Sequence, residues 1–324
     1  MSKVNRNEPK RSTASESRYS IFEFDRDFPD DAACLDYLVA WLYPNGIHCP
    51  KCDKVTKHYR DAGRPSYACE FCGHHEHPMR GTIFQDSATS LRLWFYAIYL
   101  MTSTRGGISA KQLERELGVT YKTAWRIANR IRLLMGDDVS MLAGPVEVDE
   151  TYIGGRAKNM HASKRRKVIT GSGGVDKAPV VGIVERGGKI KTFVLGHAND
   201  VKGTVMVPLV QEHVTGGADV YTDEHGAYVG LTAVGFKHRK VIHGHGVYVD
   251  GAAHTSTLEG FWDRMKPGIR GVYRQVSRKY LANYVDEYAF RYNHRKAGGR
   301  GIFDAVMSRV AKAPEAQASA GASE

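Results

Sequence analysis

Four of the five cysteines in this sequence lie in two Cys-x-x-Cys pairs, Cys49–Cys52 and Cys69–Cys72, with residues 53–68 between them. In each pair a tight turn directs two thiolates to one point, and two such turns complete a tetrahedral zinc site. Gly73 follows the second pair and suits the left-handed backbone of such a turn. Four protein ligands leave no open position, so the predicted zinc is structural. Nearby histidines offer alternative ligands for one cysteine: His48, His74, His75 and His77.

Three acidic residues, Asp149, Asp223 and Glu259, predict a second metal site of a different kind. Converging carboxylates repel one another unless cations neutralise them, and hard oxygen ligands suit Mg²⁺ or Mn²⁺. Two such ions about 4 Å apart would activate a water or a 3′-hydroxyl and stabilise the leaving oxygen of a phosphodiester. Most of the 35 Asp and Glu residues must be solvated surface charges, so the prediction depends on where these three lie.

The elements around these acids follow a recognisable order. Alternating or apolar segments predict strands at 145–153, 180–184 and 190–195, then a helix at 205–213, a strand at 219–223 and a helix at 254–266. This order is that of a ribonuclease-H-like mixed α/β domain. In such a fold adjacent strand ends bring Asp149 and Asp223 together, while the later helix delivers Glu259. On a strand, the neighbouring Glu150 points to the opposite face.

Residues 108–127 have the layout of a helix-turn-helix. A first helix places Leu113 and Leu117 inward, Gly118 permits a sharp turn, and Thr120 caps a second helix. The exposed face of that second helix suits contacts with phosphates and base edges. Its members are Tyr121, Lys122, Thr123, Arg126 and Arg130. A helical hairpin that only packs on its neighbours is the alternative interpretation.

The overall charge favours a polyanionic partner. Lys and Arg number 46 against 35 Asp and Glu, a formal net charge of +11. Cations near phosphates release condensed counterions, so such an excess favours nucleic acid, although ribosome-associated and membrane-surface proteins look similar. The N-terminus has no apolar signal segment, and no apolar run is long enough to span a bilayer. We therefore expect a cytoplasmic, nucleoid-associated protein without a membrane partner.

The chain is predicted to be a multi-domain α/β protein. The expected parts are a disordered basic arm (1–20), a helix plus zinc ribbon (21–86), a helical region with the helix-turn-helix (87–138), the ribonuclease-H-like domain (144–310) and a disordered tail (311–324). Cys34 has no partner by spacing and is expected to be a core residue.

Together these motifs resemble bacterial insertion-sequence transposases of the ISXO-like group with an N-terminal zinc ribbon. The matching stretches are 49–84, 148–155, 222–223, 259–271 and 290–295. The resemblance implies that Asp149, Asp223 and Glu259 are the metal-binding catalytic acids of an Asp–Asp–Glu transposase. Such proteins often carry Asn three residues before the glutamate, where this chain has Ser256. Ser256 is therefore expected to assist metal binding more weakly than that Asn does.

Two further basic features lie close to the predicted acids. Arg165 and Arg166 belong to a run of basic residues after the first strand, and we interpret this run as a loop that clamps DNA. A solvated loop is the simpler reading of such a run. Lys266 lies two turns after Glu259 on the same helix face and would contact the DNA backbone near the metals. The alternative is a solvated surface lysine.

Cutting and joining of DNA at element ends is the function that these features favour. The expected partner is double-stranded DNA, both element ends and target, and pairing two ends requires at least a homodimer. Two alternatives remain: a DNA-binding regulator whose second domain is inactive, and a structure-specific nuclease that cuts without joining. A serine or tyrosine recombinase would need arginines clustered around one hydroxyl, and no such cluster can be assembled from the sequence.

Overall fold

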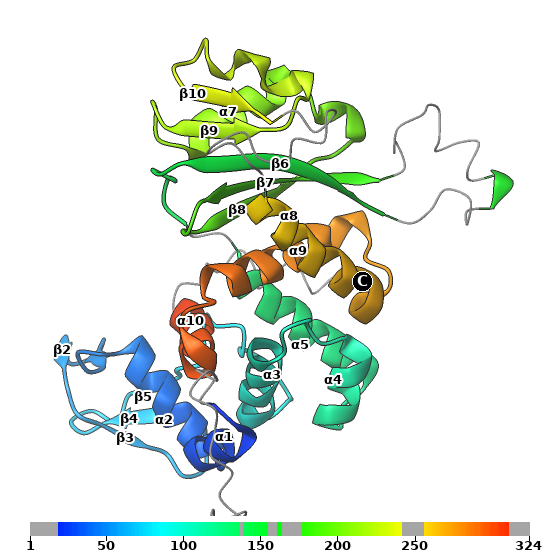
Figure 1. Ribbon diagram of the computed structural model, residues 1–324. Helices are drawn as coiled ribbons and strands as arrows, with labels where there is room; N and C mark the ends of the chain where they lie inside the picture. Colours follow the sequence, from blue (N-terminus) through cyan, green and yellow to red (C-terminus); the bar gives the residue numbers. More distant parts are fainter. Residues whose placement is uncertain (1–18, 137–138, 155–160, 164–176, 242–255, 311–324) are drawn as a thin grey trace, which may run out of the picture. The chain divides into compact units, whose positions relative to one another are not determined.

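The computed structural model describes residues 19–136, 139–154, 161–163, 177–241 and 256–310, which form two compact units (Figure 1). The helical unit contains the described residues up to Thr104, Ala110–Leu134, and those from His294 onward. The sheet unit contains Arg105–Ser109 and the described residues between Met135 and Asn293. Each unit has its own arrangement of helices and strands, and each is described separately below.

The α-helices described in the helical unit are α1 (Ile21–Asp27), α2 (Asp31–Leu42), α3 (Leu91–Ser103), α4 (Ala110–Leu117), α5 (Tyr121–Leu134) and α10 (Gly298–Val310). Their core is rich in aromatic side chains, and Phe28, Phe95 and Phe303 pack within 6.0 Å of one another by ring centroid. Such rings bury large apolar areas and dominate the energetics of a small core. Cys34 is fully buried in α2, as expected for a core residue.

The C-terminal helix α10 differs from the predicted domain plan, which included it in the domain spanning 144–310. In the structure α10 belongs to the helical unit and contacts α2, α3 and α5. The Tyr37 hydroxyl donates to Asp304 at 2.6 Å, and Arg300 pairs with Asp27 at 2.5 Å. Sequence order placed α10 beside the sheet domain, whereas its apolar face packs on helices from the other end of the chain.

The predicted basic arm extended too far toward α1. Ser20 caps α1: its side chain accepts a hydrogen bond from the Glu23 backbone, and Glu23 accepts from the Ser20 backbone at 2.6 Å. Tyr19 is buried, with 7% of its surface exposed. This capping box orders residues that composition alone assigned to the arm. The rest of the predicted arm, 1–18, and the predicted tail, 311–324, lie outside the described residues.

The cysteine-rich segment forms two small sheets, as a zinc ribbon does. Strand β1 (His48–Cys49) pairs with β2 (Lys54–Val55), and β3 (His58–Arg60), β4 (Tyr67–Cys69) and β5 (His75–Glu76) form the second sheet. All of these pairs are antiparallel. Each strand has only two or three residues, so the strands alone bury too little surface to be stable.

The strands described in the sheet unit are β6 (Val146–Ile153), β7 (Ala178–Glu185), β8 (Ile190–Val194), β9 (Asp219–Thr222) and β10 (Lys237–Lys240). Their spatial order is β10-β9-β6-β7-β8. Strands β6, β7 and β8 are antiparallel, whereas β9 runs parallel to β6 and β10 runs parallel to β9. This mixed sheet confirms the predicted ribonuclease-H-like arrangement.

Helices cover both faces of this sheet (Figure 1). On one face α7 (Gly203–His213) and the 3-10 helix η3 (Gly226–Leu231) pack on side chains such as Val148 and Ile183. On the other face α8 (Ser256–Gly268) and α9 (Arg278–Asn293) pack on side chains such as Val180 and Val184. The unit also contains two short elements, the 3-10 helix η2 (Ala198–Asp200) and the π-helical turn η5 (Ile269–Tyr273). None of the helices in the described parts of the chain is both long and apolar enough to cross a membrane.

Candidate active site

Two of the predicted acids meet at the carboxyl ends of adjacent parallel strands. Strand β6 pairs with β9 in the register Val146↔Val220 and Glu147↔Tyr221. Continued by two residues, this register places Asp149 of β6 beside Asp223, which directly follows β9. Both side chains are half-buried. The carboxyl end of parallel strands is the edge at which open α/β sheets bind their ligands.

The surroundings of Asp149 disfavour its negative charge. Burial, together with the charges of Glu150 and Asp223, raises the pKa of Asp149 to about 6, although the hydrogen bond from Trp262 lowers it. Trp262 donates its indole N–H to Oδ2 of Asp149 at 2.9 Å. Asp223 in turn accepts a hydrogen bond from the backbone N–H of His225 at 3.0 Å. A bound cation would relieve the repulsion between these carboxylates.

Glu150 lies on the opposite face of β6 from Asp149, as strand alternation predicts. Its Oε2 accepts a hydrogen bond from the buried Tyr228 hydroxyl at 2.6 Å. Burial raises the pKa of Glu150, and the charge of Asp223 adds to the effect. Tyr228 belongs to η3 and to the core on the α7 face. Glu150 is thus held on the α7 face, whereas Asp149 faces α8.

The third acid, Glu259, lies in the first turn of α8 and is exposed. The same helix supplies Trp262, which reaches Asp149, so α8 packs on the face of β6 that carries the first acid. Ser256 is the first residue of α8 and is exposed. Its assistance to a metal stays a prediction.

No role was predicted from the sequence for Glu147, which is fully buried two residues before Asp149 on the same face of β6. Its carboxylate accepts hydrogen bonds from Thr257 and Leu258 at the start of α8 and from Arg186. The alternation of β6 could have indicated a role for Glu147, because it places this acid on the same buried face as Asp149. A buried acid needs hydrogen-bond partners. Those partners lie 39 to 111 positions away along the chain and could not be identified from it.

The carboxylates fit a divalent metal by their chemistry, because Asp149 and Asp223 offer hard oxygen ligands side by side. Within the described ranges, the four cysteines are the only group of three or more potential ligands whose atoms lie within 4.8 Å of one another. The carboxylate oxygens of Asp149, Asp223 and Glu259 therefore do not all lie within 4.8 Å of one another. The structure pairs the two aspartates and places Glu259 on the helix that packs against them.

The zinc-ribbon cysteines, in contrast, are arranged as zinc ligands. Cys49 and Cys72 have their Sγ atoms 3.5 Å apart, and the Sγ atoms of Cys52 and Cys69 are 3.8 Å apart. Four sulfurs around a zinc ion at about 2.3 Å lie about 3.8 Å from one another in a tetrahedron. All four are free of disulfide bonds. The predicted ligand set Cys49, Cys52, Cys69 and Cys72 is therefore brought together, without the neighbouring histidines.

The surroundings of Cys69 favour the thiolate form of its side chain. The Thr56 hydroxyl lies 3.2 Å from Sγ of Cys69 and lowers the pKa of this thiol to about 5. A hydrogen bond with Cys72 raises the pKa of Cys52 to about 12. The cluster thus stabilises one thiolate with the protons of its neighbours. A zinc ion replaces those protons, because it binds thiolates and not thiols.

The helix-turn-helix layout is present in the helical unit. Helices α4 and α5 are joined at Gly118, whose φ of +64° suits glycine, and the Thr123 backbone N–H donates to the Thr120 hydroxyl at 3.3 Å. Leu113 and Ile127 are fully buried between the helices and their neighbours. These contacts agree with the predicted turn and cap.

The predicted DNA-facing side chains of α5 differ in exposure. Tyr121 and Lys122 are exposed, whereas Thr123 and Arg126 are half-buried. Arg130 is half-buried too, and it donates to the backbone carbonyl of Ile83 at 2.9 Å. Burial lowers the pKa of Arg130, and Arg126 adds to this effect. The exposed start of α5 is therefore the part best placed to contact a partner.

The other predicted DNA contacts are Arg165, Arg166 and Lys266. Arg165 and Arg166 fall outside the described residues. Lys266 is half-buried on α8, two turns after Glu259. Its contact with DNA remains a prediction.

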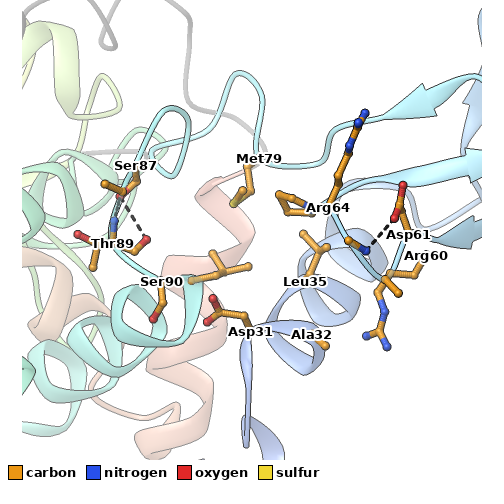
Figure 2. Close-up of a pocket in the computed structure, with 15 residues that line it drawn as sticks. Asp31, Ala32, Leu35, Arg60, Asp61, Arg64, Met79, Ser87, Thr89 and Ser90 are labelled. Atoms are coloured by element: carbon orange, nitrogen blue, oxygen red, sulfur yellow. Dashed lines mark hydrogen bonds between the residues drawn. The ribbon is translucent and has the colours of Figure 1, made fainter.

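A cavity of about 670 Å³ lies in the helical unit, between α2, the β3–β4 loop and the start of α3 (Figure 2). Acidic Asp31 and Asp61 and basic Arg60 and Arg64 line it together. Arg60 is paired with Asp36 at 3.1 Å. This balance of charges does not favour a polyanion, and none of the three predicted acids lines the cavity. It is not part of the candidate active site.

Comparison with known proteins matches two parts of the chain to transposase domains. Residues 29–75 match the transposase zinc-ribbon domain, and residues 141–293 match the ISXO2-like transposase domain. A Halobacterium salinarum protein described as an uncharacterized protein in transposable element ISH50 is 30% identical over 279 residues, which is 82% of this chain and 92% of that protein. The chain belongs to the ISXO2-like transposases.

The second of these matches ends at a boundary between the two units. The ISXO2-like transposase domain ends at residue 293, where the sheet unit ends and the chain returns to the helical unit. The transposase therefore carries a zinc-ribbon site in one unit and its candidate catalytic acids in the other. Membership of this family implies nucleotidyl transfer with a divalent metal and action on DNA.

Proposed function

We propose that this transposase binds the ends of its insertion sequence and catalyses strand cleavage and strand transfer with two divalent metal ions. Asp149, Asp223 and Glu259 would hold Mg²⁺ or Mn²⁺. The observation that carries the proposal is the parallel pairing of β6 with β9, which sets Asp149 beside Asp223 at one edge of the sheet. The raised pKa of Asp149 supports it, because a carboxylate in such surroundings gains stability from a cation.

The protein's own residues would act by positioning rather than by forming a covalent intermediate. When bound, the metal ions activate the attacking oxygen and stabilise the leaving oxygen. Asp149 is held by Trp262, Asp223 by the backbone of His225, and Glu259 by the packing of α8 on β6. In-line phosphoryl transfer depends mainly on such positioning and on charge stabilisation.

Recognition of element ends would belong to the helical unit. The exposed start of α5 would enter the major groove, with Tyr121, Lys122, Thr123 and Arg126 as contact residues and Arg130 near the phosphates. The zinc ribbon adds a second surface on which Lys54 Nζ lies 4.4 Å above the ring of Phe71, whose exposed fraction is 65%. Arg165, Arg166 and Lys266 would contact DNA near the acids. Holding two ends at once requires at least two copies of the chain.

Replacement of Lys122 and Arg126 together with alanine is expected to weaken binding of element-end DNA. Each lost phosphate contact lowers the slope of log affinity against log salt by about 0.9. Fluorescence anisotropy at several salt concentrations measures both quantities. Replacement of Arg26 and Lys189 together with alanine is the matched control, because it removes the same charge from two exposed residues outside the helix-turn-helix. An equal loss of affinity in the control would show that net charge alone drives binding.

Labelled element-end DNA, incubated with Mg²⁺ or Mn²⁺, tests the proposed function. We expect nicked and joined products with the wild type and none with Asp223→Asn. Asp219→Asn, at the other end of β9, should retain both products. Binding without cleavage would favour a DNA-binding regulator, and cleavage without joining would favour a nuclease. Cleavage that survives in Asp223→Asn would place the active site elsewhere.

A further inference from the structure

The N-terminus of α8 is held by a buried carboxylate on β6. Glu147 is fully buried, and its Oε2 accepts hydrogen bonds from the backbone N–H groups of Thr257 at 2.9 Å and Leu258 at 3.2 Å. Its Oε1 accepts one from the Thr257 hydroxyl at 2.9 Å. The first N–H groups of a helix have no partner within the helix, and the helix dipole favours a negative charge there. Glu147 therefore caps the helix that carries Glu259.

The sheet fixes Glu147 from its other side. Arg186, after β7, donates from Nε to Oε1 of Glu147 at 2.9 Å, and its guanidinium lies 4.0 Å from the ring centroid of Tyr221. Tyr221 is the partner of Glu147 in the β6–β9 register. Both carboxylate oxygens of Glu147 are thus engaged, so this acid is a structural link and not a further metal ligand.

A second link joins the same helix to the same strand. Trp262, one turn after Glu259, donates to Oδ2 of Asp149 at 2.9 Å. On β7, Gly182 is the partner of Asp149, and a Cβ there would lie 2.7 Å from Leu258 Cδ2 and 2.9 Å from Trp262 Cζ2. The absence of a side chain at Gly182 is what lets α8 approach closely enough for this hydrogen bond.

We propose that Glu147 and Trp262 are positioning residues that set α8 and the Asp149 carboxylate for metal binding by Asp149 and Glu259. The inference rests on the proposed function. Glu147 fixes where α8 begins, and Trp262 fixes which oxygen of Asp149 is turned toward the helix. An indole N–H neither coordinates a metal nor moves a proton at neutral pH, so Trp262 acts only through Asp149. Partners of metal-ligating carboxylates typically change metal affinity by about 10–100-fold when they are removed.

Isothermal titration calorimetry of the zinc-loaded full-length protein with Mn²⁺ tests the inference without DNA or turnover. Trp262→Phe keeps an aromatic ring on α8 but removes the N–H donor, and we expect its Mn²⁺ affinity to fall about tenfold or more. Trp94→Phe is the matched control. Trp94 is also buried and donates its indole N–H, to Ser87 at 2.8 Å in the helical unit. The control should lose similar thermal stability and keep the wild-type Mn²⁺ affinity.

Glu147→Gln provides a second measurement. The amide keeps the shape of the side chain but places an N–H₂ group against donors of α8 or Arg186. We expect weaker Mn²⁺ binding and a lower kcat for strand cleavage, with an unchanged KM for DNA. A purely structural role would lower the Tm and leave the Mn²⁺ affinity of the folded protein unchanged. If Glu147→Gln does not fold, Trp262→Phe alone decides.

Asp149→Asn separates the two proposals. If it loses Mn²⁺ binding while Trp262→Phe and Glu147→Gln bind as the wild type does, the positioning role is wrong and the metal site stands. If Asp149→Asn binds Mn²⁺ as tightly as the wild type, or the wild type binds none, the metal site itself is wrong. The positioning role is then overturned with it.

Discussion

Replacement of Asp149 with asparagine is expected to lower the rate of strand cleavage at least about 10³-fold at saturating Mg²⁺. The change removes the negative charge that would bind the cation, and metal-assisted charge stabilisation supplies several kcal/mol of the barrier reduction. Single-turnover cleavage of element-end DNA measures the effect. Affinity for that DNA should be unchanged, because the substitution removes none of the basic residues assigned to DNA contacts. A variant that cleaves at more than a tenth of the wild-type rate would contradict the assignment.

The same substitution should stabilise the protein in buffer without Mg²⁺ or Mn²⁺. Burial raises the pKa of Asp149 from 3.8 to about 6, so between these values the folded state binds more protons than the unfolded state. The free energy of unfolding therefore falls as pH rises from about 4 to about 6. The neutral asparagine side chain would avoid that loss, which amounts to on the order of 3 kcal/mol above pH 6.

Thermal denaturation of wild type and Asp149→Asn at pH 4 and pH 7 measures this difference. The variant should unfold at the higher temperature at pH 7, and the gap should narrow at pH 4. A destabilised variant at pH 7 would mean that the asparagine loses more through its contact with Trp262 than it gains by removing the charge.

Removal of zinc is expected to unfold the zinc ribbon. Its strands have two or three residues, and zinc binding contributes about 10–16 kcal/mol of apparent free energy to small zinc domains. Chelation, or Cys69→Ser, should therefore expose residues 43–77 to limited proteolysis and reduce the bound zinc. Mass spectrometry of the fragments and metal analysis provide the readout.

The fifth cysteine supplies the control for this experiment. Cys34 is fully buried in α2 and is not part of the four-cysteine cluster. Cys34→Ser should cost some thermal stability but retain one zinc per chain. A protein that keeps its proteolysis pattern after complete zinc removal would show that the ribbon is stable without metal.

Local pattern predicted much of the fold because each signal depends on residues close together in the chain. The Cys-x-x-Cys pairs identified four thiols that converge, since a tight turn fixes each pair. Strand alternation placed Asp149 and Glu150 on opposite faces of β6. The order of strands and helices was enough to predict the ribonuclease-H-like sheet, because few topologies fit it.

The extent of each unit was less predictable. Helix α10 follows the sheet unit in sequence yet packs with α2 and α3, because burial of an apolar face such as that of Phe303 depends on which surface is complementary. Tyr19 and Ser20 read as part of a polar arm, and the capping box with Glu23 orders them. Amino-acid composition predicted disorder for these two residues, whereas their hydrogen bonds and packing determine that they are ordered.

The amino-acid sequence by itself determined the chemistry available to this protein: four thiols for zinc, three candidate acids for a divalent metal, and a basic helix for DNA. Only the tertiary structure decided how the acids are held. Asp149 contacts Trp262, which lies 113 residues later in the chain, and Glu147 contacts Thr257 at the start of α8, 110 residues later. Contacts of this kind arise from the pairing of strands and the approach of a helix over Gly182. No local pattern specifies such a contact, because its two partners share no segment of the chain.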